Sequence, residues 1–217
     1  MHYITSDVHN DNEKLNKLLK KLDLQKDDKL YILGDLFDRS NHNPDPVGVY
    51  FSVLKLGERC QVIKENHEQE LAEYIVNYFN TKERKRGKLI PYTYNSFDLL
   101  VQRLTSVDLQ NMARWIFQLP IQVSVKIEDT DYLMAHAMTA TPENAHEEGY
   151  YLCGEDVNKF LENGIEGFIS ICGHSNPEGN TVWKNKKDNV WICDCGCGFA
   201  SGRLGCICLE TGDIIYV

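Results

Sequence analysis

Short apolar segments, each ending in a polar or glycine-marked turn, constrain most strongly how this chain can fold. They are rich in Ile, Leu, Val and Tyr and cover residues 29–33, 59–64, 131–135 and 167–172. A similar segment begins at His2. Runs of this length and composition are typical of buried β-strands.

Two helices are predicted between these strands. A polar start at residues 10–12 is followed by leucines that share one helical face, namely Leu15, Leu18, Leu19 and Leu22. A second helix is expected over residues 46–56, where Asp45 could cap the N-terminus and Pro46 suits the first turn. The alternation of strand and helix predicts an α/β core.

The middle and the end of the chain depart from this pattern. After His67 the apolar side chains recur at helical spacing, which predicts a helical insertion or cap over about residues 68–119. Its basic segment 81–88 is expected to be a solvated connector, with contact to an anionic substrate as the alternative. An antiparallel meander is expected at residues 190–193, 203–209 and 214–217. No repeat or linker divides the chain, so one domain over residues 1–217 is expected.

Charge and hydropathy limit the partners of this chain. The net charge of −9 disfavours binding to DNA or RNA, and an anionic substrate would need a local positive site such as bound metal. No segment approaches the roughly 20 apolar residues of a membrane helix, and the N-terminus lacks a charged and then apolar leader. We therefore expect a cytoplasmic protein that binds neither nucleic acids nor membranes.

Five of the eight cysteines crowd into the C-terminal region, at positions Cys193, Cys195, Cys197, Cys206 and Cys208. A zinc site is one interpretation, but structural zinc sites favour cysteine pairs two to four residues apart around a tight turn. Alternating cysteines in strands are more often small buried hydrophobic residues, so we expect reduced, buried thiols. Outside the motifs described next, His2, His42 and His146 are expected at the surface.

Side chains that can bind metal ions follow five of the predicted strands. They are Asp7 and His9, Asp35 and Asp38, Asn66 and His67, His136, and His174. The loops at the carboxyl ends of strands converge in open α/β sheets, so these side chains are expected to meet. Mixed oxygen and imidazole donors suit Mn, Fe, Zn, Co or Ni better than Mg or Ca. Two such ions about 3.5–4 Å apart can activate a shared water for attack at phosphorus.

The order of the motifs resembles that of the calcineurin-like metallophosphoesterases. The matching segments are Ser6-Asp7-Val8-His9, Gly34-Asp35-Leu36-Phe37-Asp38-Arg39, Glu65-Asn66-His67-Glu68, His136 and Gly173-His174. The Asp38-Arg39 pair and the segment from Asp194 to Leu204 resemble the phosphoprotein phosphatase branch. That branch includes bacterial and phage Ser/Thr protein phosphatases and symmetrical diadenosine tetraphosphatases. The resemblance implies an α/β/β/α sandwich with a helical insertion and a metal-dependent hydrolase.

The resemblance also implies a role for each matching residue. The first metal would be held by Asp7, His9 and Asp35, and the second by Asp35, Asn66, His136 and His174. Both ions would be divalent or trivalent, with Mn preferred, and the hydroxide between them would attack the phosphate ester. His67 would be the general acid, oriented by Asp38, and Arg39 would clamp the phosphate. Asn66, His67 and Arg39 would contact the substrate.

Several positions depart from the family pattern. Glycine is usual where this chain has Ser6, Asn10, Ser40 and Glu65, which predicts altered backbone geometry near the metals. Many protein phosphatases of the branch have a second arginine between the two late histidines, whereas residues 137–173 hold no arginine and only Lys159. Phosphate affinity or substrate choice is expected to differ accordingly.

Alternatives remain for the substrate and for individual residues. The substrate could be a Ser/Thr phosphoprotein or a small phosphomonoester, with a dinucleoside tetraphosphate or a phosphodiester as alternatives. A hypothesis of another class is a protein that binds metal and phosphate without hydrolysis, because Glu65 replaces a usual glycine and the second arginine is missing. Arg39 by itself could be part of a structural salt bridge.

Overall fold

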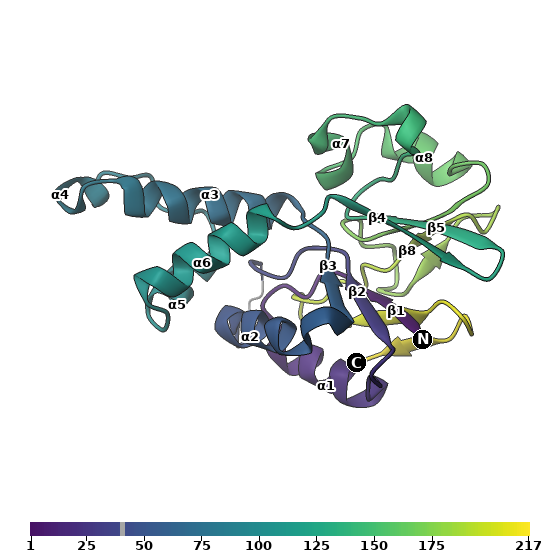
Figure 1. Ribbon diagram of the computed structural model, residues 1–217, viewed down its shortest axis with the longest axis horizontal. Helices are drawn as coiled ribbons and strands as arrows, with labels where there is room; N and C mark the ends of the chain where they lie inside the picture. Colours follow the sequence, from purple (N-terminus) through teal and green to yellow (C-terminus); the bar gives the residue numbers. More distant parts are fainter. Residues whose placement is uncertain (40–41) are drawn as a thin grey trace.

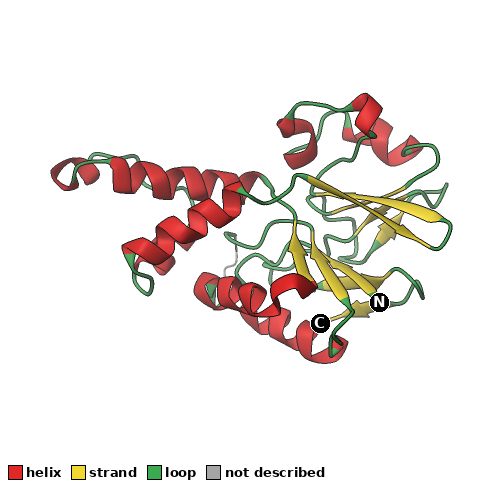
Figure 2. Ribbon diagram, viewed as in Figure 1, coloured by secondary structure: helices red, strands yellow, loops and turns green. Residues whose placement is uncertain are grey.

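The computed structural model describes residues 1–39 and 42–217, which form two β-sheets with helices on their outer faces (Figures 1 and 2). Each sheet has five strands, in the orders β10-β9-β1-β2-β3 and β4-β5-β6-β8-β7. Apolar side chains from both sheets pack together between them, among them Ile4, Tyr31, Met134 and Ile171. The predicted α/β/β/α sandwich is therefore confirmed.

The first sheet combines three parallel strands with two antiparallel ones. Its strands are β1 (His2–Thr5), β2 (Lys29–Ile32), β3 (Cys60–Val62), β9 (Gly205–Cys208) and β10 (Ile214–Tyr216). Successive side chains of β2 point to opposite faces, so Tyr31 faces the second sheet while Leu30 and Ile32 pack against helices. These helices are α1 (Asn12–Leu22) and α2 (Pro46–Leu56), followed by the short 3₁₀ helix η1 (Gly57–Arg59).

Both predicted helix starts are confirmed in detail. The side chain of Asp11 accepts a hydrogen bond of 2.9 Å from the backbone N–H of Lys14, which caps α1. Asp45 caps α2 by accepting 3.0 Å from the N–H of Gly48. These caps satisfy N–H groups that have no partner inside the helix.

The second sheet is built mainly on parallel strands. Its strands are β4 (Gln122–Ile127), β5 (Thr130–Ala135), β6 (Ile169–Cys172), β7 (Trp183–Lys184) and β8 (Val190–Ile192). Between β5 and β6 the chain forms η2 (Pro142–Asn144), α7 (Glu148–Leu152) and α8 (Val157–Asn163). Phe160 of α8 packs on Cys172 and Val190, so α8 covers the outer face of this sheet.

The helical region extends away from the sandwich (Figure 1). It consists of α3 (Asn66–Asn80), α4 (Glu83–Arg86), α5 (Ser96–Val101) and α6 (Ser106–Phe117). Leu71 and Ile75 of α3 share a buried cluster with Met112 and Ile116 of α6. The helical insertion predicted over residues 68–119 is therefore confirmed as helical. No helix in the described part of the chain is long and apolar enough to cross a membrane.

Some expectations about local structure need correction. The basic segment 81–88 is largely exposed, as expected of a solvated connector, but it contains the one-turn helix α4. The predicted meander forms only in part: β9 and β10 pair in antiparallel, but β8 pairs in parallel with β6 in the other sheet. β4, β7, α7 and α8 were not predicted. Apolar alternation identifies a strand, but the strand's partner depends on where the preceding loop carries the chain.

The cysteines are buried thiols, as expected. All eight lie among the described residues and none forms a disulfide, and the five C-terminal ones are all buried. Cys193 packs between the sheets and its Sγ lies 3.4 Å from Oγ of Ser6. Of the three histidines expected at the surface, His42 and His146 are exposed, while His2 is partly buried beside Glu210.

Candidate metal centre

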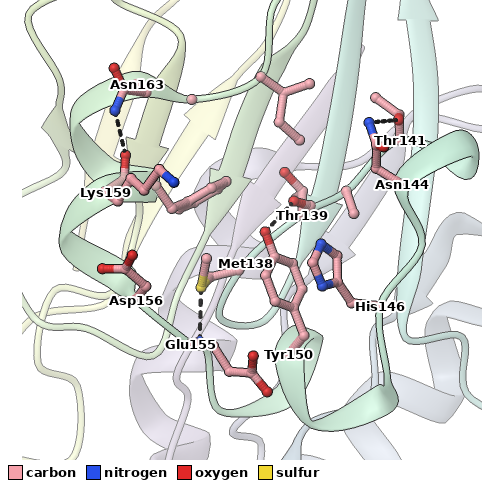
Figure 3. Close-up of a pocket in the computed structure, with 14 residues that line it drawn as sticks. Met138, Thr139, Thr141, Asn144, His146, Tyr150, Glu155, Asp156, Lys159 and Asn163 are labelled. Atoms are coloured by element: carbon pink, nitrogen blue, oxygen red, sulfur yellow. Dashed lines mark hydrogen bonds between the residues drawn. The ribbon is translucent and has the colours of Figure 1, made fainter.

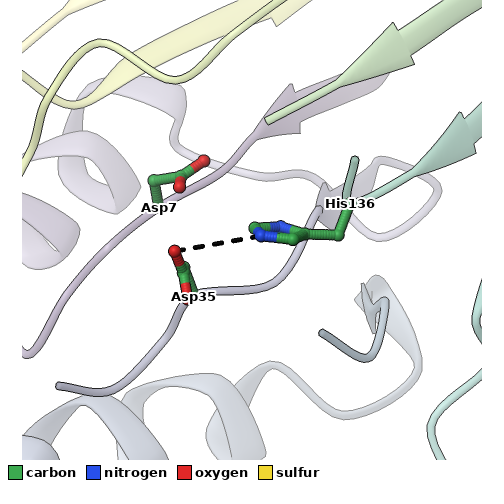
Figure 4. A group of neighbouring side chains, drawn as sticks. All are labelled: Asp7, Asp35 and His136. Atoms are coloured by element: carbon green, nitrogen blue, oxygen red, sulfur yellow. Dashed lines mark ion pairs between the residues drawn. The ribbon is translucent and has the colours of Figure 1, made fainter. Parts of the chain in front are cut away.

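The predicted ligands come from the carboxyl ends of strands in both sheets. Asp7 and His9 follow β1, Asp35 follows β2, Asn66 begins α3 after β3, and His136 and His174 follow β5 and β6. Figure 4 shows Asp7, Asp35 and His136 pointing toward one another from three separate segments. The two-sheet topology thus brings together residues that lie far apart in the sequence.

Asp35 lies at the middle of this group. Its Oδ2 is 3.4 Å from Nε2 of His9 and 3.9 Å from Nε2 of His136. Nε2 of His9 is also 3.8 Å from Oδ1 of Asp7. On the other side, Nε2 of His136 is 3.0 Å from Nδ1 of His174. One carboxylate oxygen therefore separates two clusters of donor atoms, which is the arrangement required of a bridging ligand.

Several buried oxygen atoms in this group have no hydrogen-bond partner. They are Oδ1 of Asp7, both carboxylate oxygens of Asp35 and Oδ1 of Asn66. A buried acceptor without a partner costs free energy, and an ionised one costs more. Bound cations would supply the missing partners, so the residues present fit a metal site.

The histidine rings are oriented by backbone carbonyls. Nδ1 of His136 donates to the carbonyl oxygen of Leu33 at 2.6 Å, and Nδ1 of His9 faces the carbonyl oxygen of Phe37 at 3.3 Å. A proton on Nδ1 leaves the lone pair of Nε2 free for a metal ion. The ring positions of His9 and His136 therefore suit metal binding.

Burial sets the protonation of the group in the absence of metal. It raises the pKa of the Asp7 and Asp35 carboxyls well above their usual range, and nearby acidic groups add to both shifts. Burial also lowers the pKa of His9 to about 3 and that of His136 well below its usual value. A bound cation would be held by the neutral imidazoles and would favour the ionised form of the crowded carboxyl groups.

The backbone at the site is unusually often left-handed. Positive φ angles occur at Asp7, His9, Asn10, Asp35, Asp38, Arg39 and His174. Such conformations cost free energy for residues other than glycine, and they cluster at functional sites. Asn10, at a position where glycine is usual in the resembling family, has φ 63°. Asparagine tolerates this conformation better than most residues.

Altered backbone geometry was also predicted at Glu65, but Glu65 has an ordinary extended φ of −138°. Ser40 lies outside the described residues.

The predicted acid and phosphate-binding residues lie beside this group. Nδ1 of His67 is 3.4 Å from Oδ2 of Asp38, and Nη2 of Arg39 is 2.7 Å from Nε2 of His67. Nη1 of Arg39 is 3.7 Å from Oδ2 of Asp35. The Tyr94 ring packs against His67 with centroids 4.6 Å apart. Arg39 therefore lies between His67, the candidate general acid, and the carboxylate of Asp35.

Four residues at the site were not among the catalytic, substrate-binding or metal-binding residues predicted from the sequence. Glu65 places a buried carboxyl group 3.9 Å from Nε2 of His136. Asp194 is buried and its charge helps to raise the pKa of Asp7. The glycine-rich motif around Asp194 was a signal that could have identified it. Tyr92 and Tyr94 come from the helical region, and no motif pointed to them.

A separate pocket of about 360 Å³ lies between the segment after β5 and helix α8 (Figure 3). Its lining includes Met138, Tyr150 and Lys159, and the ring of His146 stacks on Tyr150 with centroids 3.8 Å apart. None of the predicted metal ligands lines it. Lys159, the only basic residue between the two late histidines apart from His146, therefore contributes to this pocket.

Solved structures resemble this one over its whole length. A candidate diadenosine tetraphosphatase aligns over 100% of this chain and 92% of its own, with a TM-score of 0.71 and 19% identity. A hypothetical protein from Pyrococcus horikoshii aligns over 100% and 87%, with a TM-score of 0.59 and 15% identity. A Saccharomyces cerevisiae Ser/Thr phosphatase, similar to human phosphatase PP5, aligns over 100% and 78%, with a TM-score of 0.58 and 14% identity. At these identities the likeness concerns the fold.

Sequence comparison identifies the family. No curated protein sequence matches the chain. The family model for calcineurin-like phosphoesterases matches residues 3–178, which include all six predicted metal ligands. That family depends on two metal ions, and the group formed by Asp7, Asp35 and His136 could hold one. This chain therefore belongs to the calcineurin-like phosphoesterases, hydrolases that act on phosphate esters.

Proposed function

We propose that the chain is a single catalytic domain that hydrolyses phosphate monoesters, on a Ser/Thr phosphoprotein or a small molecule. The observation that carries the proposal is the position of Asp35. Its Oδ2 lies between Nε2 of His9 and Nε2 of His136, with Asp7 beside the first and His174 beside the second. Such an oxygen can serve two adjacent cations.

The ligand roles follow from this arrangement. Asp7, His9 and Asp35 would hold one ion, while Asp35, Asn66, His136 and His174 would hold the other. When bound, two such ions lower the pKa of a shared water and offset the charge of the phosphate oxygens. The mixed donor set favours Mn, with Fe, Zn, Co and Ni as the other ions that fit.

Two residues beside the metals act on the substrate in this proposal. His67 protonates the leaving oxygen, and Asp38, 3.4 Å from its Nδ1, orients the ring. Arg39 lies half-exposed between His67 and Asp35, where its planar guanidinium can bind two phosphate oxygens. Phosphate binding would draw Arg39 away from Nε2 of His67, which leaves that nitrogen free for the leaving group.

The variant His67→Asn tests the acid role. We expect its kcat for a phosphoserine peptide, whose alkoxide leaving group needs a proton, to fall by about 10²–10⁴-fold, as is typical for loss of a general acid or base. Metal content, measured by mass spectrometry, should stay at the wild-type value because His67 is not a proposed ligand. The matched control is His146→Asn, an exposed histidine in the separate pocket. Full activity of His67→Asn would refute the acid role.

A second candidate function is hydrolysis of a dinucleoside tetraphosphate. It is supported by the fold shared with the candidate diadenosine tetraphosphatase along the whole chain. A parallel assay with a phosphopeptide, p-nitrophenyl phosphate, a phosphodiester and diadenosine tetraphosphate distinguishes the substrate classes. The highest kcat/KM among them identifies the class, and no turnover of any, with two metals bound, would overturn the proposed function.

A further inference from the structure

The carboxyl group of Glu65 lies inside the candidate metal centre. Glu65 is fully buried, and its Oε2 is 3.9 Å from Nε2 of His136. Its side chain folds back over Gly34, where an added Cβ would lie 2.5 Å from Cγ of Glu65. Gly34 precedes the central carboxylate Asp35 in the chain. The absence of a side chain at Gly34 therefore gives Glu65 its place beside Asp35 and His136.

Glu65 adds negative charge where little positive charge balances it. The acidic side chains of Asp7, Asp35, Glu65 and Glu68 are all fully buried. Among the described residues, no lysine or arginine forms an ion pair with Glu65, and Arg39 pairs with Asp35 at 3.7 Å. Buried carboxylates without cationic partners are strongly destabilising. This arrangement calls for cations in the site.

Glu65 also caps helix α3. Its Oε2 accepts a hydrogen bond of 2.6 Å from the N–H of His67, and its Oε1 accepts one of 2.5 Å from the N–H of Glu68. Serine, threonine or aspartate would cap the helix with a shorter side chain. Capping alone therefore does not explain a side chain that reaches His136. Each carboxylate oxygen keeps a second lone pair, so the cap and a metal bond are compatible.

The distances around His136 fit donors to one ion. Two donors at about 2.1 Å from the same ion can be at most about 4.2 Å apart. Nε2 of His136 is 3.0 Å from Nδ1 of His174 and 3.9 Å from both Oδ2 of Asp35 and Oε2 of Glu65. All three separations are below this limit.

We propose that Glu65 is a further metal ligand, which adds a carboxylate oxygen to the second metal position formed by Asp35, Asn66, His136 and His174. The inference rests on the proposed two-metal function. An additional hard oxygen donor and an additional negative charge would strengthen binding of a divalent ion such as Mn²⁺ at this position. The first position, near Asp7 and His9, would be unaffected.

Titration of metal-free protein with Mn²⁺ tests this role. Isothermal titration calorimetry should give two sites in the wild type. Glu65→Ser keeps a good helix cap but removes the carboxylate, and we expect one site to weaken by at least about tenfold while the other is unchanged. Glu65→Gln keeps the size of the side chain and should weaken the same site. With two Mn²⁺ ions added per protein molecule, electron paramagnetic resonance should show coupling between the two ions in the wild type. This coupling should be lost in both Glu65 variants.

The alternative outcomes are distinct. If Glu65 only caps α3, both variants will bind two Mn²⁺ ions with wild-type affinity, and the proposal is overturned. Circular dichroism of the metal-free proteins checks folding, and the glutamine variant remains informative if the serine variant is unfolded. If Glu65→Ser and Glu65→Gln weaken one Mn²⁺ site but the wild type hydrolyses no phosphate ester, the proposed function fails while the ligand role stands. If the wild type is active and Glu65→Ser binds both ions normally, only the ligand role fails.

Discussion

Tyr92 donates a hydrogen bond of 2.6 Å to Oδ2 of Asp38. Tyr92 lies in the helical region between α4 and α5, whereas Asp38 follows β2 at the metal centre. The same oxygen of Asp38 is 3.4 Å from Nδ1 of His67. The helical region therefore contacts the carboxylate that faces the proposed general acid, so it does more than cover the sandwich.

Tyr92→Phe removes this hydrogen bond and keeps the ring. We expect kcat for a phosphoserine peptide to fall by about 10- to 150-fold, because a hydrogen bond to a charged group contributes about 1.5–3 kcal/mol. Metal content should not change. The control is Tyr78→Phe, a tyrosine of the same region that packs on Phe79 and does not contact Asp38. Equal kcat values for the two variants would contradict the positioning role.

Arg39→Lys separates phosphate binding from a structural ion pair. Lysine keeps the charge near Asp35 but lacks the planar fork that binds two oxygens. We expect kcat/KM to fall by about 10- to 100-fold, mainly through KM, because the lost bidentate contact costs about 1.4–2.8 kcal/mol. Arg86→Lys, whose guanidinium lies over the Tyr78 ring, is the matched control. An unchanged kcat/KM would favour the salt-bridge interpretation.

Removal of metal should make stability depend on pH. Burial raises the pKa of Glu68 to about 8 and also raises the pKa of Asp7, Asp35 and Glu65. A carboxyl group with a raised pKa in the folded protein adds to the free energy of unfolding at pH values below its pKa in the unfolded chain. That contribution is lost as the pH rises toward its pKa in the folded protein. Burial lowers the pKa of His9, His136 and His174, so the unfolded state loses their remaining protons between about pH 6.5 and 7.5, which opposes this loss of stability by a smaller amount.

We therefore expect the free energy of unfolding of chelated protein to fall by about 2 kcal/mol or more between about pH 6.5 and pH 8. Urea unfolding at several pH values measures this change. The protein saturated with Mn²⁺ is the control, because bound cations keep the carboxylates ionised in the folded state. The same slope with and without metal would contradict the assignment of Asp7 and Asp35 to the metal centre.

Thiol labelling should separate the cysteines by burial. Cys153 is exposed, Cys60 is partly buried and the other cysteines are buried. We expect a disulfide reagent to modify one thiol rapidly in the folded protein and all eight after denaturation. Cys153→Ser should abolish the rapid phase. Rapid modification of several thiols in the native protein would contradict the buried packing of the C-terminal cysteines.

Local sequence was sufficient for most of the elements. The leucine spacing and Asp11 identified α1, while Asp45 and Pro46 identified α2 with its bounds unchanged. Sequence did not identify α7 or α8, which have five and seven residues and too few turns for a clear apolar period. β4 was also missed, because several of its side chains are partly exposed and it pairs at the edge of the sheet.

Pairing between strands that lie far apart in the sequence could not be predicted in the same way. Residues 190–217 were expected to form one antiparallel meander, but the chain passes from β8 in one sheet to β9 in the other, and only β9 and β10 pair as expected. This crossing places Asp194 beside Asp7. Which sheet a strand joins depends on long-range packing between apolar faces, and the alternation of side chains along one strand does not specify it.

The sequence by itself determined the family, the α/β architecture and the chemical type of the donors, because those depend on residue identity and order. Only the tertiary structure decided that Oδ2 of Asp35 lies between His9 and His136, that Tyr92 bonds to Asp38, and that Glu65 folds over Gly34. The physical reason is that these contacts join separate strands, loops and helices. Their distances follow from how two sheets and a helical region pack, and no spacing along the chain encodes them.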